Sequence, residues 1–374
     1  MDESRRKFLR DLGKLSVLAL ATRGVVAWPR GLNTGPIDLL VVGDSFIWGQ
    51  GLEEKEKFYT HIAEWLRREA FGHERDVRIN VQAHSGSTIK LHENEAEAFK
   101  KAGRTEADRY EPEVNVGFPS IWHQVSAAKK GYASVGNESG ADIVLVSGGI
   151  TDISVAKLLD PNGDPKLLPP MIEKYCGDDM SELLEHAGST NPNALLVVIG
   201  YFPILSPKSD AGKVYNGWLE AMGFPRALKS FANNPLTRSM FFRGIRDRTI
   251  NRSRIWVTES NRQLINAVER FNQAAGKRRA IFVPSPITED TCYETPNTLL
   301  FRMGSMGRSE DPLFRERLAQ CRSALPQLKR STGLDYPVRY CEIAAIGHPN
   351  AAGSVAYATA IKAKLTQQFA AHPL

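Results

Sequence analysis

Short apolar runs that alternate with helical segments constrain the fold of this 374-residue chain more than any other feature. The runs cover residues 37–42, 77–82, 141–147, 194–201 and 279–283. They are rich in Val, Ile and Leu and are bounded by Gly, Asn or Asp, which is typical of strands. Strands that alternate with helices favour a parallel sheet with helices on both faces. We therefore expect an α/β fold, a flavodoxin-like three-layer α/β/α sandwich around a mainly parallel five-stranded sheet.

Amphipathic spacing predicts the helices that connect these strands. They cover residues 57–69, a helix that starts near 121, and residues 167–187, 254–276 and 351–369. Between 203 and 254 the pattern loosens and prolines recur, so we interpret this part as a helical and loop insertion that covers part of the site. Residues 284–340 are expected to form loops and short helices.

Small polar residues follow three of the predicted strands. Gly43-Asp44-Ser45 ends the first, Gly86 lies in the loop after the second, and Gly149-Ile150-Thr151-Asp152 follows the third. Ligands of open α/β sheets bind beyond the carboxyl ends of the strands, so these residues should meet at one edge. Ser45 is the candidate nucleophile, because a helix that begins after it would place backbone donors near a developing oxyanion.

Nucleotide binding is the obvious alternative for such a sheet, and the sequence argues against it. None of the strands is followed by GxGxxG or by GxxxxGK[ST], the loops that hold phosphates in the common nucleotide-binding folds. The chain also has no CxxC or Cys/His spacing of a metal site. We expect no cofactor and no metal.

The N-terminus looks like a bacterial twin-arginine export signal. The adjacent Arg5 and Arg6 are followed by Lys7 and then Phe8-Leu9, and a weakly apolar run with small residues continues up to Ala27. We interpret residues 1–27 as the signal, 28–36 as a linker and 37–374 as the mature domain. The twin-arginine export machinery is then a partner, and the mature protein is periplasmic or secreted. A basic amphipathic helix at the terminus is the alternative.

Charge gives no support for a nucleic-acid partner. The formal net charge is +6, but residues 1–27 hold six Lys or Arg and three Asp or Glu, so the remaining chain carries +3. It has no dense basic run interleaved with aromatic residues. No later segment is long and apolar enough to predict a stable membrane span.

Four cysteines allow either disulfides or buried free thiols. They are Cys176, Cys292, Cys321 and Cys341. In an oxidising compartment they could pair in three ways, which the sequence does not distinguish.

The polar blocks resemble those of the SGNH (GDSL-type) hydrolases over essentially the whole mature chain. Gly43-Asp44-Ser45 matches the nucleophile block, Gly86 matches the oxyanion glycine, and Gly347-His348-Pro349-Asn350 matches the histidine block. The resemblance implies Ser45 and His348 as catalytic residues, and Ser45, Gly86 and Thr151 as the oxyanion hole. Asp44, Gly149 and Asp152 would support the loops around them.

The chain departs from the family pattern at two positions. Thr151 stands where the family has an oxyanion asparagine, and Ala345 stands where the family has the acid three residues before the histidine. Glu342 and Asp335 precede His348 without the family spacing. We therefore expect a Ser-His dyad whose histidine is oriented by a main-chain oxygen.

Three functions are compatible with these residues. The first is a serine esterase or lipase-like hydrolase that cleaves carboxylic esters of a small molecule, glycan or lipid through an acyl-enzyme on Ser45. The second is a catalytically weakened protein of the same fold that binds an acylated glycan or lipid, which the changes at Thr151 and Ala345 favour. The third is an acyltransferase or deacetylase on polysaccharide that uses the same residues.

Overall fold

A single parallel sheet forms the centre of the computed structural model, which describes residues 35–108, 110–210, 212–214, 235–304 and 307–371. Its strands are β1 Ile37–Val42, β2 Val77–Val81, β3 Ile143–Val146, β4 Leu195–Ile199 and β5 Ala280–Val283. They lie in the order β2-β1-β3-β4-β5, and every neighbouring pair is parallel. This is the flavodoxin-like strand order, so the predicted fold class and all five strands are confirmed.

Burial explains why these runs become strands. Every residue of β1, β3 and β4 is buried, as expected for strands covered by helices on both faces. The strand β2 lies at the edge of the sheet, and its Arg78 and Ile79 are exposed. The apolar runs therefore correspond to the central strands, and the more polar run corresponds to the edge.

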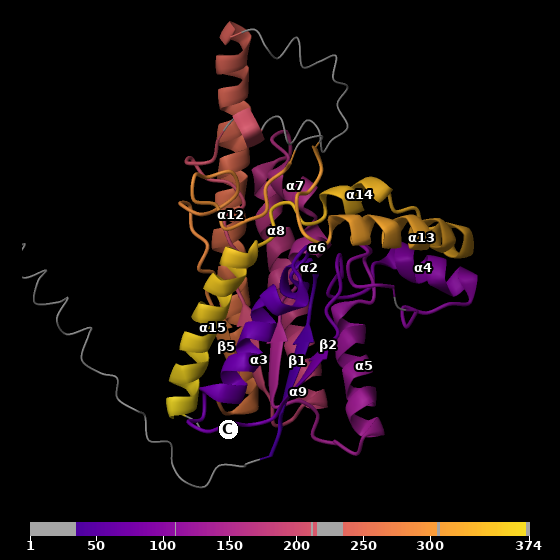
Figure 1. Ribbon diagram of the computed structural model, residues 1–374. Coiled ribbons are helices and arrows are strands. Elements are labelled where there is room, and N and C mark those ends of the chain that lie inside the picture. Colours follow the sequence, from indigo (N-terminus) through magenta and orange to yellow (C-terminus); the bar gives the residue numbers. More distant parts are fainter. Residues whose placement is uncertain (1–34, 109, 211, 215–234, 305–306, 372–374) are drawn as a thin grey trace, which may run out of the picture.

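Helices cover both faces of the sheet and gather beyond its carboxyl edge (Figure 1). The α-helices are α2 Ser45–Trp48, α3 Phe58–Arg68, α4 Glu93–Ala102, α5 Ile121–Ser134, α6 Ile150–Ile153, α7 Val155–Leu159, α8 Leu168–Ile172, α9 Met180–Thr190, α12 Pro235–Ala275, α13 Phe314–Thr332, α14 Val338–Ile343 and α15 Ala351–Ala371. Short 3₁₀ turns lie at η1 Glu54–Glu56 and η2 Pro165–Leu167, and η3 Glu173–Asp179 is a π-helical segment. Helices α3 and α15 pack together on one face, whereas α5, α9 and α12 cover the other.

The helical predictions differ from the structure in two places. The helix expected at 254–276 begins at Pro235, so much of the segment interpreted as a loose insertion is one long helix, α12. The region expected to hold only loops and short helices contains the 19-residue helix α13. Pro326 lies inside α13. A proline in a weakly apolar pattern normally indicates the end of a helix, so the sequence does not predict a continuous one here. Residues 215–234 of the expected insertion and the expected signal lie outside the described residues.

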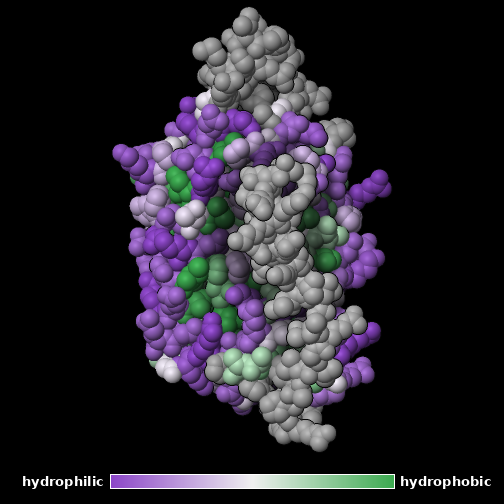
Figure 2. Space-filling view, turned by 90° about the vertical axis from the view of Figure 1, so that its left-hand side faces the viewer, coloured by the Kyte–Doolittle hydropathy of each residue, from purple (hydrophilic) through white to green (hydrophobic). Residues whose placement is uncertain are grey.

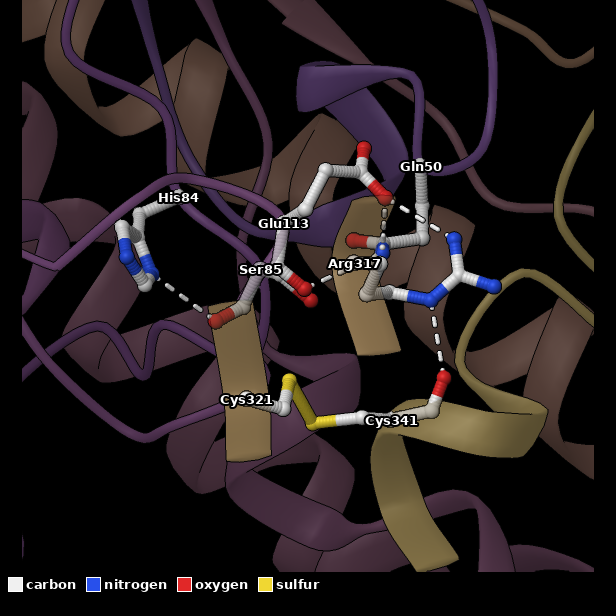
Figure 3. Close-up of a disulfide and its surroundings, with 7 residues drawn as sticks. All are labelled: Gln50, His84, Ser85, Glu113, Arg317, Cys321 and Cys341. Atoms are coloured by element: carbon white, nitrogen blue, oxygen red, sulfur yellow. Dashed lines mark hydrogen bonds and ion pairs between the residues drawn. A yellow bond between two sulfur atoms is a disulfide. The ribbon is translucent and has the colours of Figure 1, made fainter. Parts of the chain in front are cut away.

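A second, smaller core lies under α4, α13 and α14. It contains Phe99, Val114, Val116, Phe118, Cys321, Leu325, Leu328 and Cys341. Cys321 and Cys341 form a disulfide that joins α13 to α14 (Figure 3), whereas Cys176 and Cys292 are buried free thiols. Both alternatives predicted for the cysteines therefore occur in this chain.

The described helices include none that is long and apolar enough to cross a membrane. The face shown in Figure 2 is mainly hydrophilic, and its hydrophobic residues form small separate areas.

Candidate active site

Two side chains that are far apart in the sequence meet at the carboxyl edge of the sheet. Ser45 directly follows β1, and His348 lies in the loop before α15. The Oγ atom of Ser45 lies 2.8 Å from Nε2 of His348. That distance allows direct proton transfer between the hydroxyl and the imidazole.

A tight turn after β1 presents Ser45. Gly43 has φ +147°, and a Cβ at this position would lie 2.6 Å from Cγ2 of Ile47 and 2.7 Å from the carbonyl oxygen of Ser147. Asp44 caps the short helix α2, because its Oδ1 accepts a hydrogen bond from the amide of Phe46 at 3.1 Å. The turn therefore requires glycine at 43 and an N-cap side chain at 44.

Asp44 is buried and accepts two further hydrogen bonds. The hydroxyl of Tyr201 donates to Oδ2 at 2.9 Å, and the hydroxyl of Ser147 donates to Oδ1 at 3.1 Å. Burial raises the pKa of Asp44 to about 6, although Tyr201, Ser147 and the Phe46 amide favour the charged form. The predicted supporting role of Asp44 thus has a physical basis, since it ties the nucleophile turn to β3 and β4.

His348 is held in its neutral form. Burial, followed by the positive charge of Arg317, lowers its pKa to about 4. The carbonyl groups of Ile346 and Ala345 and the carboxylate of Asp311 oppose this shift. At neutral pH the imidazole is consequently unprotonated and can accept a proton from Ser45.

No carboxylate among the residues that the structure describes orients this imidazole. Among the described residues none makes a hydrogen bond with the buried Nδ1 of His348, so the nearby carbonyls of Ala345 and Ile346 do not meet bonding geometry. Glu342 pairs with Arg339 at 3.0 Å, and Asp335 pairs with Lys329 at 2.6 Å. Neither of the acids considered from the sequence therefore serves as the third member of a triad.

Two backbone amides are available for an oxyanion. In the described part of the chain, the N–H groups of Ser45 and Gly86 donate to no other residue. Gly86 has φ +83°, and a Cβ there would lie 2.4 Å from Oδ1 of Asn115 and 2.6 Å from the carbonyl oxygen of Val116. Only glycine fits this position.

The hydroxyl of Thr151 points to a different acceptor. Its Oγ1 donates to the carbonyl oxygen of Ser87, one residue beyond Gly86. A hydroxyl has one proton to donate, so an oxyanion would have to compete with Ser87 for it. The oxyanion role of Thr151 remains a prediction.

The other supporting residues hold the loops that follow β2 and β3. Asp152 accepts hydrogen bonds from the amide of Ile89 at 3.0 and 3.2 Å, so it braces the Gly86 loop rather than the Ser45 turn. Gly149 has φ +116° and packs against Cys176, whose Sγ would lie 2.7 Å from a Cβ at 149.

Sequence reasoning missed Gln124, which joins two of the loops. Its Oε1 accepts from the Gly43 amide at 2.7 Å, and its Nε2 donates to Oγ of Ser87 at 2.9 Å. Gln124 lies on α5 and is fully buried. The sequence offers only a weak signal for it, a glutamine at helical spacing among Ile121, Val125 and Ala128.

No metal centre accompanies these groups in the described ranges, where no three His, Cys, Asp or Glu side chains gather as ligands. The described residues thus include a serine hydroxyl in contact with an imidazole and two backbone amides that donate to no other residue, and nucleophilic catalysis by serine requires groups of these kinds.

Comparison with known proteins finds only distant structural similarity. No protein-family model matches the chain, and no curated protein matches it. A lipase from a goat rumen metagenome is 13% identical, with a TM-score of 0.40 over 88% of this chain and 97% of the other. An extracellular lipase from Streptomyces rimosus is 14% identical, with a TM-score of 0.42 over 87% and 99%.

A family two carbohydrate esterase from Clostridium thermocellum is 11% identical, with a TM-score of 0.39 over 89% of this chain and 64% of the other. Similarity at this level does not assign a family.

Proposed function

We propose that this protein is a serine esterase or lipase-like hydrolase that acts on carboxylic ester bonds. The observation that carries the proposal is the 2.8 Å contact between Ser45 Oγ and His348 Nε2, with an imidazole that burial keeps neutral. A histidine in this state can serve as general base for the serine hydroxyl. The free amides of Ser45 and Gly86 supply the complementary charge stabilisation.

The chemistry proceeds through an acyl-enzyme. Ser45 transfers its hydroxyl proton to Nε2 of His348 while Oγ attacks the ester carbon, and the carbonyl oxygen becomes an oxyanion facing the Ser45 and Gly86 amides. The intermediate collapses, the C–O bond to the alcohol breaks, and His348 returns the proton to the leaving alkoxide. Water then repeats the sequence, which releases the carboxylic acid and regenerates Ser45.

Labelling with a fluorophosphonate probe tests this proposal. We expect a stoichiometric adduct on Ser45 of the purified mature protein, together with turnover of short-chain p-nitrophenyl esters. Ser45→Ala should abolish both, and His348→Ala should slow both by about 10³-fold or more. Absence of adduct and turnover from the folded wild-type protein would reject the hydrolase.

A catalytically weakened binding protein is the second candidate. Two observations favour it, because the Thr151 hydroxyl is already bonded to Ser87 and no group in the described part of the chain bonds Nδ1 of His348. Such a protein would bind an acylated glycan or lipid without turnover. This candidate would be supported if Ser45 took no probe and the protein bound an acetylated oligosaccharide but not its deacetylated form.

An acyltransferase or deacetylase on polysaccharide would use the same acyl-enzyme. In an acyltransferase a sugar hydroxyl receives the acyl group in place of water. In a deacetylase a sugar hydroxyl is the alcohol that is released. Turnover of a p-nitrophenyl ester with and without an added oligosaccharide separates a transferase from a hydrolase. Transfer yields an acylated sugar, whereas hydrolysis yields free acid only.

Export through the twin-arginine pathway, to the periplasm or beyond, completes the proposal. The disulfide between Cys321 and Cys341 supports an oxidising compartment, because such bonds rarely persist in a reducing cytoplasm. Replacing Arg5 and Arg6 by lysine should retain the protein in the cytoplasm. Continued export of that variant would contradict the assignment of the signal.

A further inference from the structure

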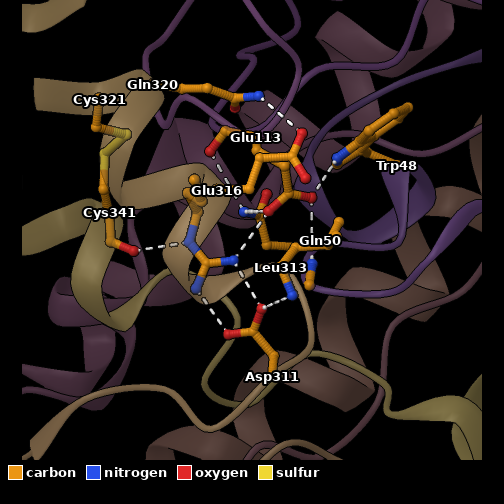
Figure 4. A network of polar contacts seen from close by, with 11 residues as sticks. Trp48, Gln50, Glu113, Asp311, Leu313, Glu316, Gln320, Cys321 and Cys341 are labelled. Carbon is orange, nitrogen blue, oxygen red and sulfur yellow. Dashed lines mark hydrogen bonds and ion pairs between the residues drawn. A yellow bond between two sulfur atoms is a disulfide. The ribbon is translucent and has the colours of Figure 1, made fainter. Parts of the chain in front are cut away.

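A fully buried arginine lies between the loop that carries the nucleophile and the segment that carries the base. Arg317, on α13, is 0% exposed. Its Nη1 and Nη2 bond the two carboxylate oxygens of Asp311 at 3.0 and 2.7 Å, and Nη1 also bonds Oε2 of Glu113 at 2.9 Å (Figure 4). Its Nε donates to the carbonyl oxygen of Cys341 at 2.8 Å. A buried charge is tolerated when it is paired in this way.

Glu113 connects this arginine to the residues that follow Ser45. Its Oε1 accepts from Nε1 of Trp48 at 2.8 Å and from the amide of Gly51 at 3.2 Å. Its Oε2 accepts from Nε2 of Gln50 at 2.8 Å as well as from Arg317. One carboxylate therefore fixes the segment 48–51, which directly continues the nucleophile helix α2.

The other side of the network reaches the segment that carries His348. The Cys341 carbonyl belongs to α14, and the disulfide to Cys321 ties α14 to the helix that carries Arg317 (Figure 3). Gly51 is in close contact with the segment that carries His348 and with the carboxylate of the network. A Cβ at this position would lie 2.7 Å from Cβ of Ala345 and 2.9 Å from Cγ of Asp311.

Ala345 is directly coupled to the base. The backbone amide of His348 donates to its carbonyl oxygen at 3.0 Å. Ala345 itself is fully buried, so it cannot move away from Gly51 without disturbing the packing of both loops.

We propose that Glu113, Arg317 and Asp311 are positioning residues that hold the Ser45 turn and the His348 segment at reacting distance, a role that the family acid serves in a triad and that Ala345 cannot serve here. This inference rests on the proposed ester hydrolysis. It assigns the work of orientation to the two loops rather than to a hydrogen bond on Nδ1 of His348.

The network also acts on His348 through its charge. Burial is the main cause of the low pKa of this imidazole, the guanidinium of Arg317 lowers it further, and the carboxylate of Asp311 raises it. The carbonyl groups of Ile346 and Ala345, on the histidine's own segment, also favour the protonated form. A change in the network should thus be visible at His348 even where no substrate is present.

The test uses a substitution that removes one charge of each sign. Replacing Arg317 alone by a neutral residue leaves two carboxylates buried without a partner, which by itself threatens folding. The double variant Glu113→Gln with Arg317→Gln keeps the net charge of the cluster and leaves only one buried carboxylate, Asp311, without its arginine. The full mature chain carries the variant, and its melting temperature is recorded first.

We expect kcat for a short-chain ester to fall about 10- to 100-fold with KM changed less than about threefold, because a misplaced reacting group costs rate rather than binding. In an NMR titration of labelled histidine, assigned with His348→Ala, the pKa of His348 should rise by about one unit, since Arg317 is gone and Asp311 remains. The single variant Glu113→Gln, which retains Arg317, should lose rate with a smaller pKa change.

A matched control lies at the end of the same helix. Lys329 of α13 and Asp335, just beyond the helix, form an exposed ion pair at 2.6 Å, and the double variant Lys329→Gln with Asp335→Asn should match wild type in every readout. The inference is overturned when the Glu113/Arg317 variant loses only thermal stability and keeps the wild-type kcat, labelling rate and His348 pKa. A wild-type protein that takes no probe would reject ester hydrolysis, and the His348 titration would still decide on the network.

Discussion

The hydroxyl of Thr151 donates its proton to the backbone carbonyl of Ser87, in the loop that also carries Gly86. An asparagine at 151 would bring two N–H donors to this place. The threonine has a single O–H donor, and that donor is bonded to the Ser87 carbonyl. The bond stabilises the Gly86 loop, and it leaves the oxyanion with two amide donors unless Thr151 turns toward it.

Thr151→Asn should accelerate the enzyme. Removing one oxyanion donor from a serine hydrolase costs about 10² to 10³ in kcat, so restoring an amide should raise kcat by at least about 10-fold. The KM should change little, because the gain arises as charge develops on the oxygen. Steady-state kinetics on a short-chain p-nitrophenyl ester measure this.

Thr151→Val is the companion variant. It removes the hydroxyl and should lower the free energy of unfolding by about 1 kcal/mol, because the Ser87 carbonyl loses a partner. With Thr151 bonded to Ser87 in the active protein, kcat should remain within about threefold of wild type. A fall of about 100-fold would instead show that Thr151 donates to the oxyanion, as the sequence predicts.

The fold could be predicted from the sequence because its strands are locally encoded. The runs that became β1, β3 and β4 are apolar throughout except for Asp38 in β1, and strands that helices cover on both faces require this composition. Helix α13 was missed because its apolar residues face the small second core, which the sequence did not indicate. The helical segment after Pro235 was missed because proline and scattered charges were interpreted as breaks.

The site was predictable only in part. Ser45 and His348 were identified because they lie in short motifs, and the structure brings them into contact. Arg317 and Glu113 belong to no motif. Their role arises because folding buries them against each other, although they are 204 positions apart in the sequence. No local pattern distinguishes such a pair from surface charges.

The pH dependence of the reaction should reveal the low pKa of His348. The base must be unprotonated, and burial lowers its pKa from the ordinary 6.5 to about 4. Accordingly the titration of His348 should leave kcat/KM level as the pH falls from 7 to about 5 and lower it tenfold per unit only below about 4. A smaller step near pH 6 would belong to Asp44, whose pKa burial raises to about 6. Circular dichroism over the same range establishes that the protein remains folded.

The same shift affects stability with a defined sign. Because the folded-state pKa of His348 lies below that of the unfolded chain, the unfolded state binds more protons between about pH 4 and 6.5. The contribution of His348 to the free energy of unfolding is complete above that window and is lost as the pH falls through it. An NMR titration in which His348 changes protonation near pH 6.5 would mean that it titrates as an exposed histidine does.

Gly86→Ala should damage both the fold and the reaction. The residue has φ +83°, and the new methyl group would overlap Asn115 and the carbonyl of Val116. We expect a loss of about 3 kcal/mol in the free energy of unfolding and at least a 100-fold fall in kcat, because the amide at 86 is displaced.

Gly72→Ala is the matched control for this glycine. Gly72 has φ +70°, but no atom lies within 4 Å of the place of its Cβ. This variant should lose about 1 kcal/mol from the backbone alone and keep wild-type kcat. Equal losses from the two variants in urea unfolding would show that the contacts around Gly86 add nothing.

Removing the disulfide should loosen the part of the structure that holds the base. Cys321 and Cys341 are 20 positions apart, and a loop of this length corresponds to about 3 kcal/mol of stabilisation in the chain-entropy estimate. The double variant Cys321→Ser with Cys341→Ser should unfold at a correspondingly lower urea concentration. Dithiothreitol should lower the melting temperature of the wild type and leave that of the double variant unchanged.

Cys292→Ser is the control, because this buried free thiol lies near polar groups of Ser209 and Glu289 that a hydroxyl can bond. It should cost less than about 1 kcal/mol, and a Cys321→Ser with Cys341→Ser variant that unfolds at the wild-type urea concentration would show that the bond contributes no stability.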